Sequence, residues 1–190
     1  MWQGGLSKSW YRGLAIIVYY LYTGCMVSLV ADTDALIKLT RCGAKEAVAT
    51  AFRLIIPDAV RNEAITQGMD RGFDDAALLA ANLVNGYIGV VAAEKEDPNS
   101  NVLPKGGERE VYLLFLQERG LGHKAMLASD DHRFLRRLAL LGVGALTPGA
   151  VLVSLAQNGH VPKHQVITWL DSLRPLVSPA EYELCTQALL

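Results

Sequence analysis

Short apolar runs alternate with longer segments of helical spacing along most of this chain, and that alternation most constrains the fold. Five runs are rich in aliphatic residues and lie at 27–31, 53–57, 87–93, 125–129 and 143–147. Unbroken apolar runs are typical of strands that are covered on both faces, as in a parallel sheet. The intervening segments begin at proline or aspartate and end at glycine, as helices do. The pattern predicts an α/β protein, a three-layer α/β/α fold with a mainly parallel sheet of about five strands, followed by C-terminal helices.

The pattern divides the chain into three parts. Residues 26–147 carry the alternation and are expected to form the main domain. Residues 148–190 are predicted to form three helices, separated by prolines, that pack on this domain as an extension. Residues 1–25 precede the first predicted strand and form an N-terminal extension of uncertain role. With 51% hydrophobic and 19% charged residues, the chain has the composition of a folded core and not of a disordered segment.

The apolar stretch 13–31 follows Lys8 and Arg12 and resembles a signal anchor. A bilayer span needs roughly 20 apolar residues, so length alone permits one here. The second half of the stretch also fits a buried strand that leads into a helix, and Asp32 and Asp34 close the apolar run. We therefore expect no membrane association and a cytoplasmic location.

The cysteines, the histidines and the charge exclude some classes of protein. Cys25, Cys42 and Cys185 are odd in number and widely spaced, which indicates buried thiols in a reducing compartment. His160 and His164 have no neighbouring ligands at zinc spacing. The formal net charge is −1, so a polyanionic partner would need a local basic patch.

Acidic residues follow two of the predicted strands. Asp32 and Asp34 come after the first strand, and Asp130 and Asp131 come after the fourth. The carboxyl ends of parallel strands share one edge, where ligands bind in open α/β sheets. Each aspartate alone has the ordinary interpretation of a helix cap. Carboxylates gathered in one cleft, however, repel one another unless protons or divalent cations neutralise them.

Two further predicted helices carry acids toward the same edge. Glu63 lies in the helix after the second strand, and Glu108 and Glu110 open the helix after a glycine-rich loop. Residues two apart on a helix point to different sides, so only one of Glu108 and Glu110 faces the cleft. We favour Glu108 and leave Glu110 open. By the same argument, one of the adjacent Asp130 and Asp131 binds metal while the other caps or supports.

The segments ADTDALIKL, IPDAVRNEA, GGERE and LASDDHRF occur in this order and resemble the PIN-domain family of metal-dependent nucleases. The resemblance covers residues 27 to about 147. It implies a PIN-like sheet and a four-acid site, with Mg²⁺ or Mn²⁺ as cofactor and hydrolysis of phosphodiester bonds, most often in RNA. Its motifs match the acids Asp32, Glu63, Glu108 and Asp131, with Asp130 as the competing fourth acid. The first 25 residues and the C-terminal helices lie outside the family pattern.

Polar and basic residues near the four acids have predicted supporting roles. Carboxylate oxygens suit a hard divalent ion, and Thr33, Asp34 and Ser129 are placed to orient the ligands. The basic residues near the glycine loop and the fourth acid are candidates to contact RNA phosphates, or else form a solvated basic face. They are Lys105, His132, Arg133, Arg136 and Arg137.

Two functional hypotheses of different class follow. The first is an endoribonuclease dependent on Mg²⁺ or Mn²⁺, which the resemblance extends to the toxin of a toxin–antitoxin pair, with a small antitoxin protein or a second copy of the chain as partner. The alternative is a catalytically silent PIN-like module that binds nucleic acid or protein. A signalling domain with a phosphoacceptor aspartate is a weaker alternative, because residues 143–151 after the last strand contain no lysine.

Overall fold

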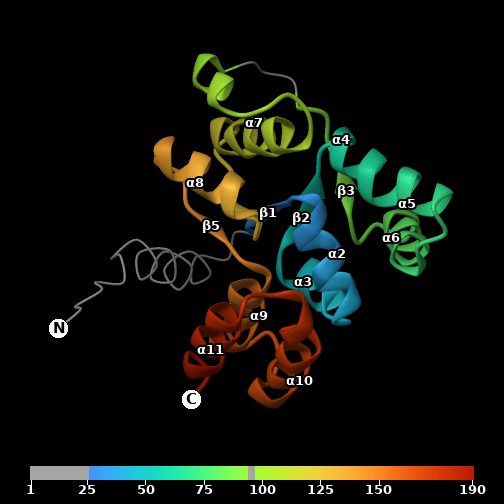
Figure 1. Ribbon diagram of the computed structural model, residues 1–190, viewed down its shortest axis with the longest axis vertical. Coiled ribbons are helices and arrows are strands. Elements are labelled where there is room, and N and C mark those ends of the chain that lie inside the picture. The colour runs from blue at the N-terminus through green and yellow to red at the C-terminus, as the bar shows by residue number, and fades with distance from the viewer. Residues whose placement is uncertain (1–25, 94–96) are drawn as a thin grey trace.

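A computed structural model describes residues 26–93 and 97–190, and the extension expected at 1–25 lies outside the described residues (Figure 1). Within the described part, one sheet of five strands has the order β3-β2-β1-β4-β5, and all neighbours are parallel. The strands are β1 (Ser28–Ala31), β2 (Arg53–Ile56), β3 (Gly89–Val90), β4 (Ala125–Ala128) and β5 (Ala145–Leu146). The predicted parallel α/β sheet is confirmed.

The helices between the strands form the outer layers. Those between β1 and β3 are α2 (Thr33–Arg41), α3 (Lys45–Ala51), α4 (Asp58–Arg61), the π-helix η1 (Asn62–Thr66), α5 (Gln67–Asp70) and α6 (Asp74–Val84). Those between β3 and β5 are the 3₁₀ helix η2 (Pro98–Val102), α7 (Gly107–Gly120) and α8 (His132–Leu140). Parallel crossovers are right-handed, so the outward path β1-β2-β3 and the opposite path β4-β5 place their helices on opposite faces. Figure 1 accordingly shows α7 and α8 on one side of the strands and α2 and α3 on the other.

The C-terminal extension consists of α9 (Pro148–Gln157), α10 (Lys163–Leu173), the 3₁₀ helix η3 (Arg174–Leu176) and α11 (Pro179–Gln187). Helix α9 contacts α2, α3 and β5, and α10 contacts α2, so the extension packs on the sheet domain. Inside it, α11 contacts both α9 and α10.

The central strands are buried on both faces. Leu29 and Val30 in β1 and Leu127 in β4 are fully buried, which accounts for their unbroken apolar sequence. Cys42 and Cys185 are buried free thiols, as the sequence predicts, and Cys25 lies outside the described residues.

The described part of the chain was expected to contain no membrane-spanning helix. No helix in residues 26–93 and 97–190 is both long and apolar enough to cross a membrane. The last residues of the apolar stretch 13–31 form β1 instead.

The order of the strands fixes where a site can form. Strands β1 and β4 are neighbours, with Ala31 beside Ala128, but the chain leaves them toward opposite edges of the sheet. A parallel sheet opens a crevice at such a switch point, beyond the carboxyl ends of its strands. Asp32 follows β1 and Ser129 follows β4, so both lie at the switch point.

Candidate acidic site at the carboxyl edge of the sheet

Asp32 stands at the centre of the edge. Its backbone N–H donates to the Ala128 carbonyl at 3.0 Å, and its Oδ1 accepts from Ala35 N at 2.8 Å as the cap of α2. Burial raises the pKa of Asp32 from 3.8 to about 7; the negative charges of Asp34 and Asp130 raise it further, against hydrogen bonds from Ser129 and the Ala35 backbone. The carboxyl group therefore keeps its proton to a much higher pH than an ordinary aspartate does.

Ser129 joins the two strand ends. It is fully buried, its hydroxyl is hydrogen-bonded to the Asp32 carboxylate, and its Oγ accepts from Asp131 N at 3.2 Å. The hydroxyl therefore orients the carboxylate of one acid and holds the backbone of another.

The adjacent Asp130 and Asp131 side chains make different contacts. Asp131 Oδ1 accepts from Arg133 N at 2.6 Å and from Phe134 N at 3.0 Å, which makes Asp131 the N-cap of α8. The Asp130 carboxylate instead pairs through Oδ2 with the ammonium group of Lys38. The geometry therefore favours Asp130, the competing fourth acid, over Asp131 as a direct ligand.

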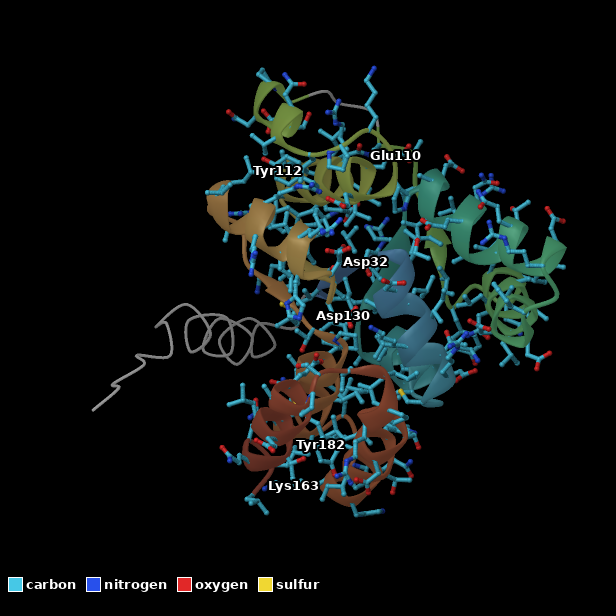
Figure 2. The ribbon with its side chains drawn as sticks, viewed as in Figure 1. Asp32, Glu110, Tyr112, Asp130, Lys163 and Tyr182 are labelled. Carbon is cyan, nitrogen blue, oxygen red and sulfur yellow. The ribbon has the colours of Figure 1, made fainter. Side chains whose placement is uncertain are left out.

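One oxygen of Asp130 lacks a partner. Its side chain is only 11% exposed, and its Oδ1 atom is buried without a hydrogen-bond partner among the described residues. A buried carboxylate oxygen without a donor costs free energy, typically about 1–3 kcal/mol. Figure 2 shows Asp130 beside Asp32 near the middle of the molecule, so the orphan oxygen belongs to the same edge.

The other predicted acids reach this edge from α2 and η1. The Thr33 hydroxyl donates to Glu63 Oε2 at 2.8 Å, which ties η1 to the start of α2. Desolvation raises the pKa of Asp34, and the charges of Asp130, Glu63 and Asp131 raise it further against the effect of Lys38. These acids therefore lie within electrostatic range of one another.

The start of α7 also approaches the cluster. A Cβ atom placed on Gly107 would lie 3.7 Å from Glu63 Oε2, so the glycine before Glu108 borders the site. Glu108 itself accepts a 2.7 Å hydrogen bond from Arg137 of α8. Arg137, expected to contact RNA, is thus engaged by an acid, and Glu108 is already neutralised.

Glu110 has a different role. Its Oε2 atom accepts from Ala59 N at 3.0 Å and so satisfies the first turn of α4, 51 residues away in the chain. Figure 2 shows Glu110 on α7, displaced from Asp32 and Asp130. Of the two glutamates that open α7, Glu110 is bound to the backbone of α4 and Glu108 is paired with Arg137.

Helix α8 carries several basic residues directly after Asp130 and Asp131. His132, Arg133 and Arg136 are accessible to solvent, and no ion pair involves them within residues 26–93 and 97–190. Lys105 is also exposed, on the loop that precedes α7. Arg133 and Arg136 of α8 therefore present accessible guanidinium groups on the helix that Asp131 caps.

Two residues of the edge have roles that the sequence did not predict. Lys38 pairs with Asp130. Its position four residues after Asp34, on the same helix face, could have indicated that Lys38 faces the acidic edge. Glu181 of α11 accepts a 3.0 Å hydrogen bond from Gly149 N and is hydrogen-bonded to the Thr147 side chain. The contacts of Glu181 join segments 32 or more residues apart, so local sequence carries no signal for them.

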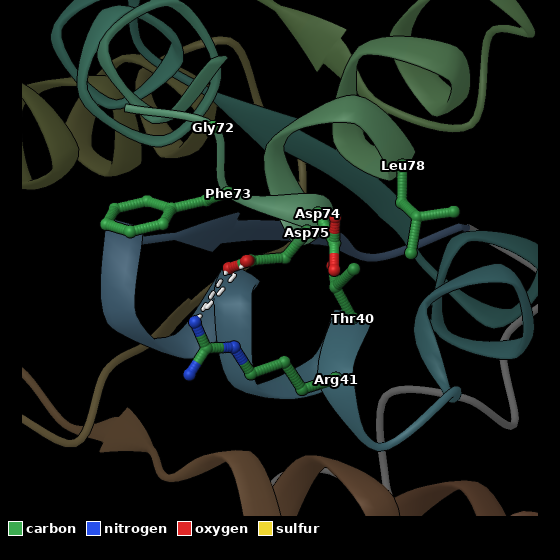
Figure 3. A pocket seen from close by; sticks show the side chains of 7 residues that line it. All are labelled: Thr40, Arg41, Gly72, Phe73, Asp74, Asp75 and Leu78. Carbon is green, nitrogen blue, oxygen red and sulfur yellow. Dashed lines mark hydrogen bonds and ion pairs between the residues drawn. The ribbon is translucent and has the colours of Figure 1, made fainter. Parts of the chain in front are cut away.

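A shallow pocket of about 450 Å³ lies elsewhere, between the end of α2 and the start of α6 (Figure 3). Arg41 and Asp75 pair across it at 3.2 Å. Asp32 precedes α2 and Arg41 ends it, and at 1.5 Å per residue the two ends of that helix are about 13 Å apart. The pocket is therefore separate from the acidic edge.

The donor set at the edge suits a divalent cation with few protein ligands. Within the described residues, no three His, Cys, Asp or Glu side chains form a ready-made metal cluster. Mg²⁺ commonly uses only one or two carboxylates and keeps several waters. The partly protonated Asp32 and the orphan Asp130 Oδ1 fit that requirement, because a cation would replace the proton on one and satisfy the other.

The fold and the site together define a parallel α/β protein with several acidic side chains at its switch point. Comparisons with models of protein families, with curated proteins and with solved structures gave no significant match.

Proposed function

We propose that this chain is a divalent-cation-dependent phosphodiesterase that cleaves RNA. The observation that carries the proposal is the meeting of Asp32 and Asp130 at the switch point, with one carboxyl group held partly protonated and one carboxylate oxygen unsatisfied. Like charges at such a place favour a cation between them. The resemblance of the four sequence motifs to PIN-domain nucleases supports RNA as the substrate.

The residues of the chain would divide the task. Asp32 and Asp130 would hold Mg²⁺ or Mn²⁺, with Glu63, Asp34, Glu108 and Asp131 around them. When bound, the ion supplies Lewis acidity toward the phosphoryl oxygens and toward water. Ser129 and Thr33 would hold the Asp32 and Glu63 carboxylates in place through the hydrogen bonds described above. Arg133 and Arg136 would bind phosphates of the substrate.

The proposed reaction is hydrolysis. The oxygen of water forms a bond to phosphorus, the bond between phosphorus and the leaving ester oxygen breaks, and the proton released by water passes to the leaving oxygen or to solvent.

The test is cleavage of end-labelled single-stranded RNA with Mn²⁺, Mg²⁺ or EDTA. We expect cleavage only with the metals and a loss of about 100-fold or more in Asp32→Asn and Asp130→Asn, which keep their size. Asp70→Asn, an exposed aspartate on α5, is the matched control. Wild-type rates in both site variants, with melting temperatures unchanged, would reject the site.

A second function is favoured by two ion pairs. Lys38 already neutralises Asp130, and Arg137 already neutralises Glu108, as in a site that no longer binds metal. The alternative is therefore a catalytically silent module that binds nucleic acid through α8. It predicts RNA binding that is unaffected by EDTA, with no Mn²⁺ bound by the protein. The antitoxin partner, the homodimer and the cytoplasmic location stay predictions.

A further inference from the structure

The C-terminal extension contributes a carboxylate to the acidic edge. Strand β5 pairs with β4 so that Leu146 lies beside Ala128, and Ser129 N donates to the Leu146 carbonyl at 2.9 Å. Thr147, the next residue, therefore lies beside Ser129 and close to Asp130. The Glu181 carboxylate is hydrogen-bonded to this Thr147 side chain, which places the first turn of α11 at the same edge.

The packing of α11 against α9 fixes this carboxylate. Glu181 Oε1 accepts from Gly149 N at 3.0 Å, at the start of α9. A Cβ atom on Gly149 would lie 3.0 Å from that same oxygen and 2.7 Å from Cys185 Sγ. Only glycine leaves room for the two helices at this distance, so the position of Glu181 is strongly determined.

Lys38 acts electrostatically on three acids, Asp130, Asp34 and Glu181. Its ammonium group contacts Asp130, and its charge also acts on Glu181, as does the charge of Asp130. A cation that binds Asp130 must compete with this ammonium group. The lysine side chain is flexible and only 21% exposed, so a nearby carboxylate favours its charge when it leaves Asp130. Asp34 and Glu181 are both within electrostatic range, but Asp34 is exposed to solvent and Glu181 is partly buried.

We propose that Glu181 is a positioning residue that receives the Lys38 ammonium group when a divalent cation binds Asp130. This inference rests on the proposed function, because it assigns a role in cation binding. Helices α9 and α11 would then form part of the site and not only an extension of the fold. With Glu181 present, the lysine exchanges one carboxylate for another, and its ammonium group is not left half-buried without a counter-charge.

The experiment is a Mn²⁺ titration of the full chain, followed by electron paramagnetic resonance, on a double-mutant cycle. Glu181→Gln keeps an oxygen that can accept from Gly149 N but removes the charge. We expect it to weaken Mn²⁺ binding about tenfold. We expect Lys38→Met to bind Mn²⁺ more tightly than wild type, and the addition of Glu181→Gln to Lys38→Met to change the affinity less than about twofold. Glu183→Gln, exposed on the same helix, is the control.

The outcomes separate the two proposals. If Glu181→Gln lowers the Mn²⁺ affinity equally with and without Lys38, the effect of the Glu181 charge does not involve the lysine. That result would overturn the proposed transfer of the Lys38 ammonium group. Wild-type affinity in Glu181→Gln would overturn it as well. No Mn²⁺ binding by the wild type or by Lys38→Met would refute the proposed function and the transfer with it. Melting curves report folding, and Glu181→Asp, which retains the charge on a shorter side chain, is expected to lose less affinity than Glu181→Gln.

Discussion

The Thr33 hydroxyl donates to Glu63 Oε2 at 2.8 Å, although the two residues are 30 positions apart. This bond connects the helix after β1 with the helix after β2, at the edge where Asp32 lies. A hydroxyl that orients a carboxylate affects activity more than stability when the bond is exposed to solvent.

The first prediction concerns this bond. Thr33→Val removes the hydroxyl at nearly constant shape and should lower the rate of metal-dependent RNA cleavage about 10- to 100-fold. The free energy of unfolding should change by less than about 1 kcal/mol. Thr50→Val is the control, because the Thr50 hydroxyl donates to the Glu46 carbonyl on an exposed helix face. Equal rates in both variants would show that Glu63 needs no orientation.

The second prediction concerns pH. The pKa of Asp32 is about 7 in the folded protein, against an ordinary value of 3.8, so the folded protein binds more protons between these values. Stability should therefore fall as pH rises from 4 to 7, and the ionised Asp32 should cost most above pH 7. Asn at this position can keep the cap on Ala35 N without the charge. Asp32→Asn should raise the free energy of unfolding by about 1–3 kcal/mol at pH 8.

Urea denaturation at pH 4, 6 and 8 measures this effect. The difference between Asp32→Asn and the wild type should be smallest near pH 4, because the wild-type carboxyl is then protonated in the folded state and about half protonated in the unfolded chain. A difference that is the same at all three pH values would show that Asp32 is not a titrating group in this range.

The third prediction concerns Glu118, at the opposite end of the sheet. Its Oε2 atom accepts from Ser28 Oγ at 2.6 Å and Arg53 Nη1 at 2.6 Å and lies 2.9 Å from His123 Nδ1. Burial would raise the pKa of Glu118, but the hydrogen bonds from Ser28 and His123 and the charge of Arg53 together lower it. Glu118→Gln should therefore lose about 1–3 kcal/mol of stability at pH 7.

The sign of the pH effect follows from the lowered pKa. The stabilisation from Glu118 is present above its usual pKa of 4.5 and is lost as pH falls through the lower folded pKa. Guanidinium denaturation should show the gap between Glu118→Gln and the wild type closing below pH 4.5. The exposed Glu183→Gln variant should have the same stability as the wild type both at pH 7 and below pH 4.5.

The fourth prediction concerns packing of the C-terminal helices. Gly149→Ala places a methyl group 2.7 Å from Cys185 Sγ, so we expect a loss of about 1–3 kcal/mol despite the better helix propensity of alanine. Gly120→Ala on α7 meets no atom within 4 Å among the described residues and should be neutral or stabilising by up to about 1 kcal/mol. Thermal melting compares the two variants, and Cys185→Ala should partly rescue Gly149→Ala.

The fifth prediction concerns RNA binding. Arg133→Gln and Arg136→Gln together should weaken binding and reduce the slope of log K against log salt by about 1 for each lost phosphate contact. Arg71→Gln changes the residue directly after α5, a helix that Figure 1 shows far from α8, and should leave the slope unchanged. Fluorescence anisotropy in EDTA at several salt concentrations measures binding without cleavage. An unchanged slope in the double variant would exclude α8 as the RNA-binding face.

The sheet could be predicted because its central strands are buried on both faces and so have unbroken apolar sequences. The edge strands were predicted too long. Residues 87–93 were expected to form a strand, but β3 contains only Gly89 and Val90, and the strand expected at 143–147 shortens to Ala145 and Leu146. Each edge strand has a pairing partner on one side only, so apolar sequence there continues beyond the hydrogen-bonded ladder.

The sequence predicted which strands and helices carry the acids of the site, but not which contacts each carboxylate makes. Strand ends placed Asp32 and the 130/131 pair at one edge, but local sequence does not decide which adjacent acid caps α8. Capping depends on the backbone angles at Asp131, which lie in the extended region. Partners such as Ala59 for Glu110 and Gly149 for Glu181 join distant segments, and only the packed structure brings them together.

Glu63 lies within η1, where the helix widens to π geometry between α4 and α5. The sequence predicted a continuous helix here, and a π turn is usually an insertion of one residue into an α-helix. Each inserted residue turns the following side chains by about 100° around the axis. The direction in which Glu63 points can therefore change through a single insertion or deletion in this helix, while the strand before the helix stays fixed.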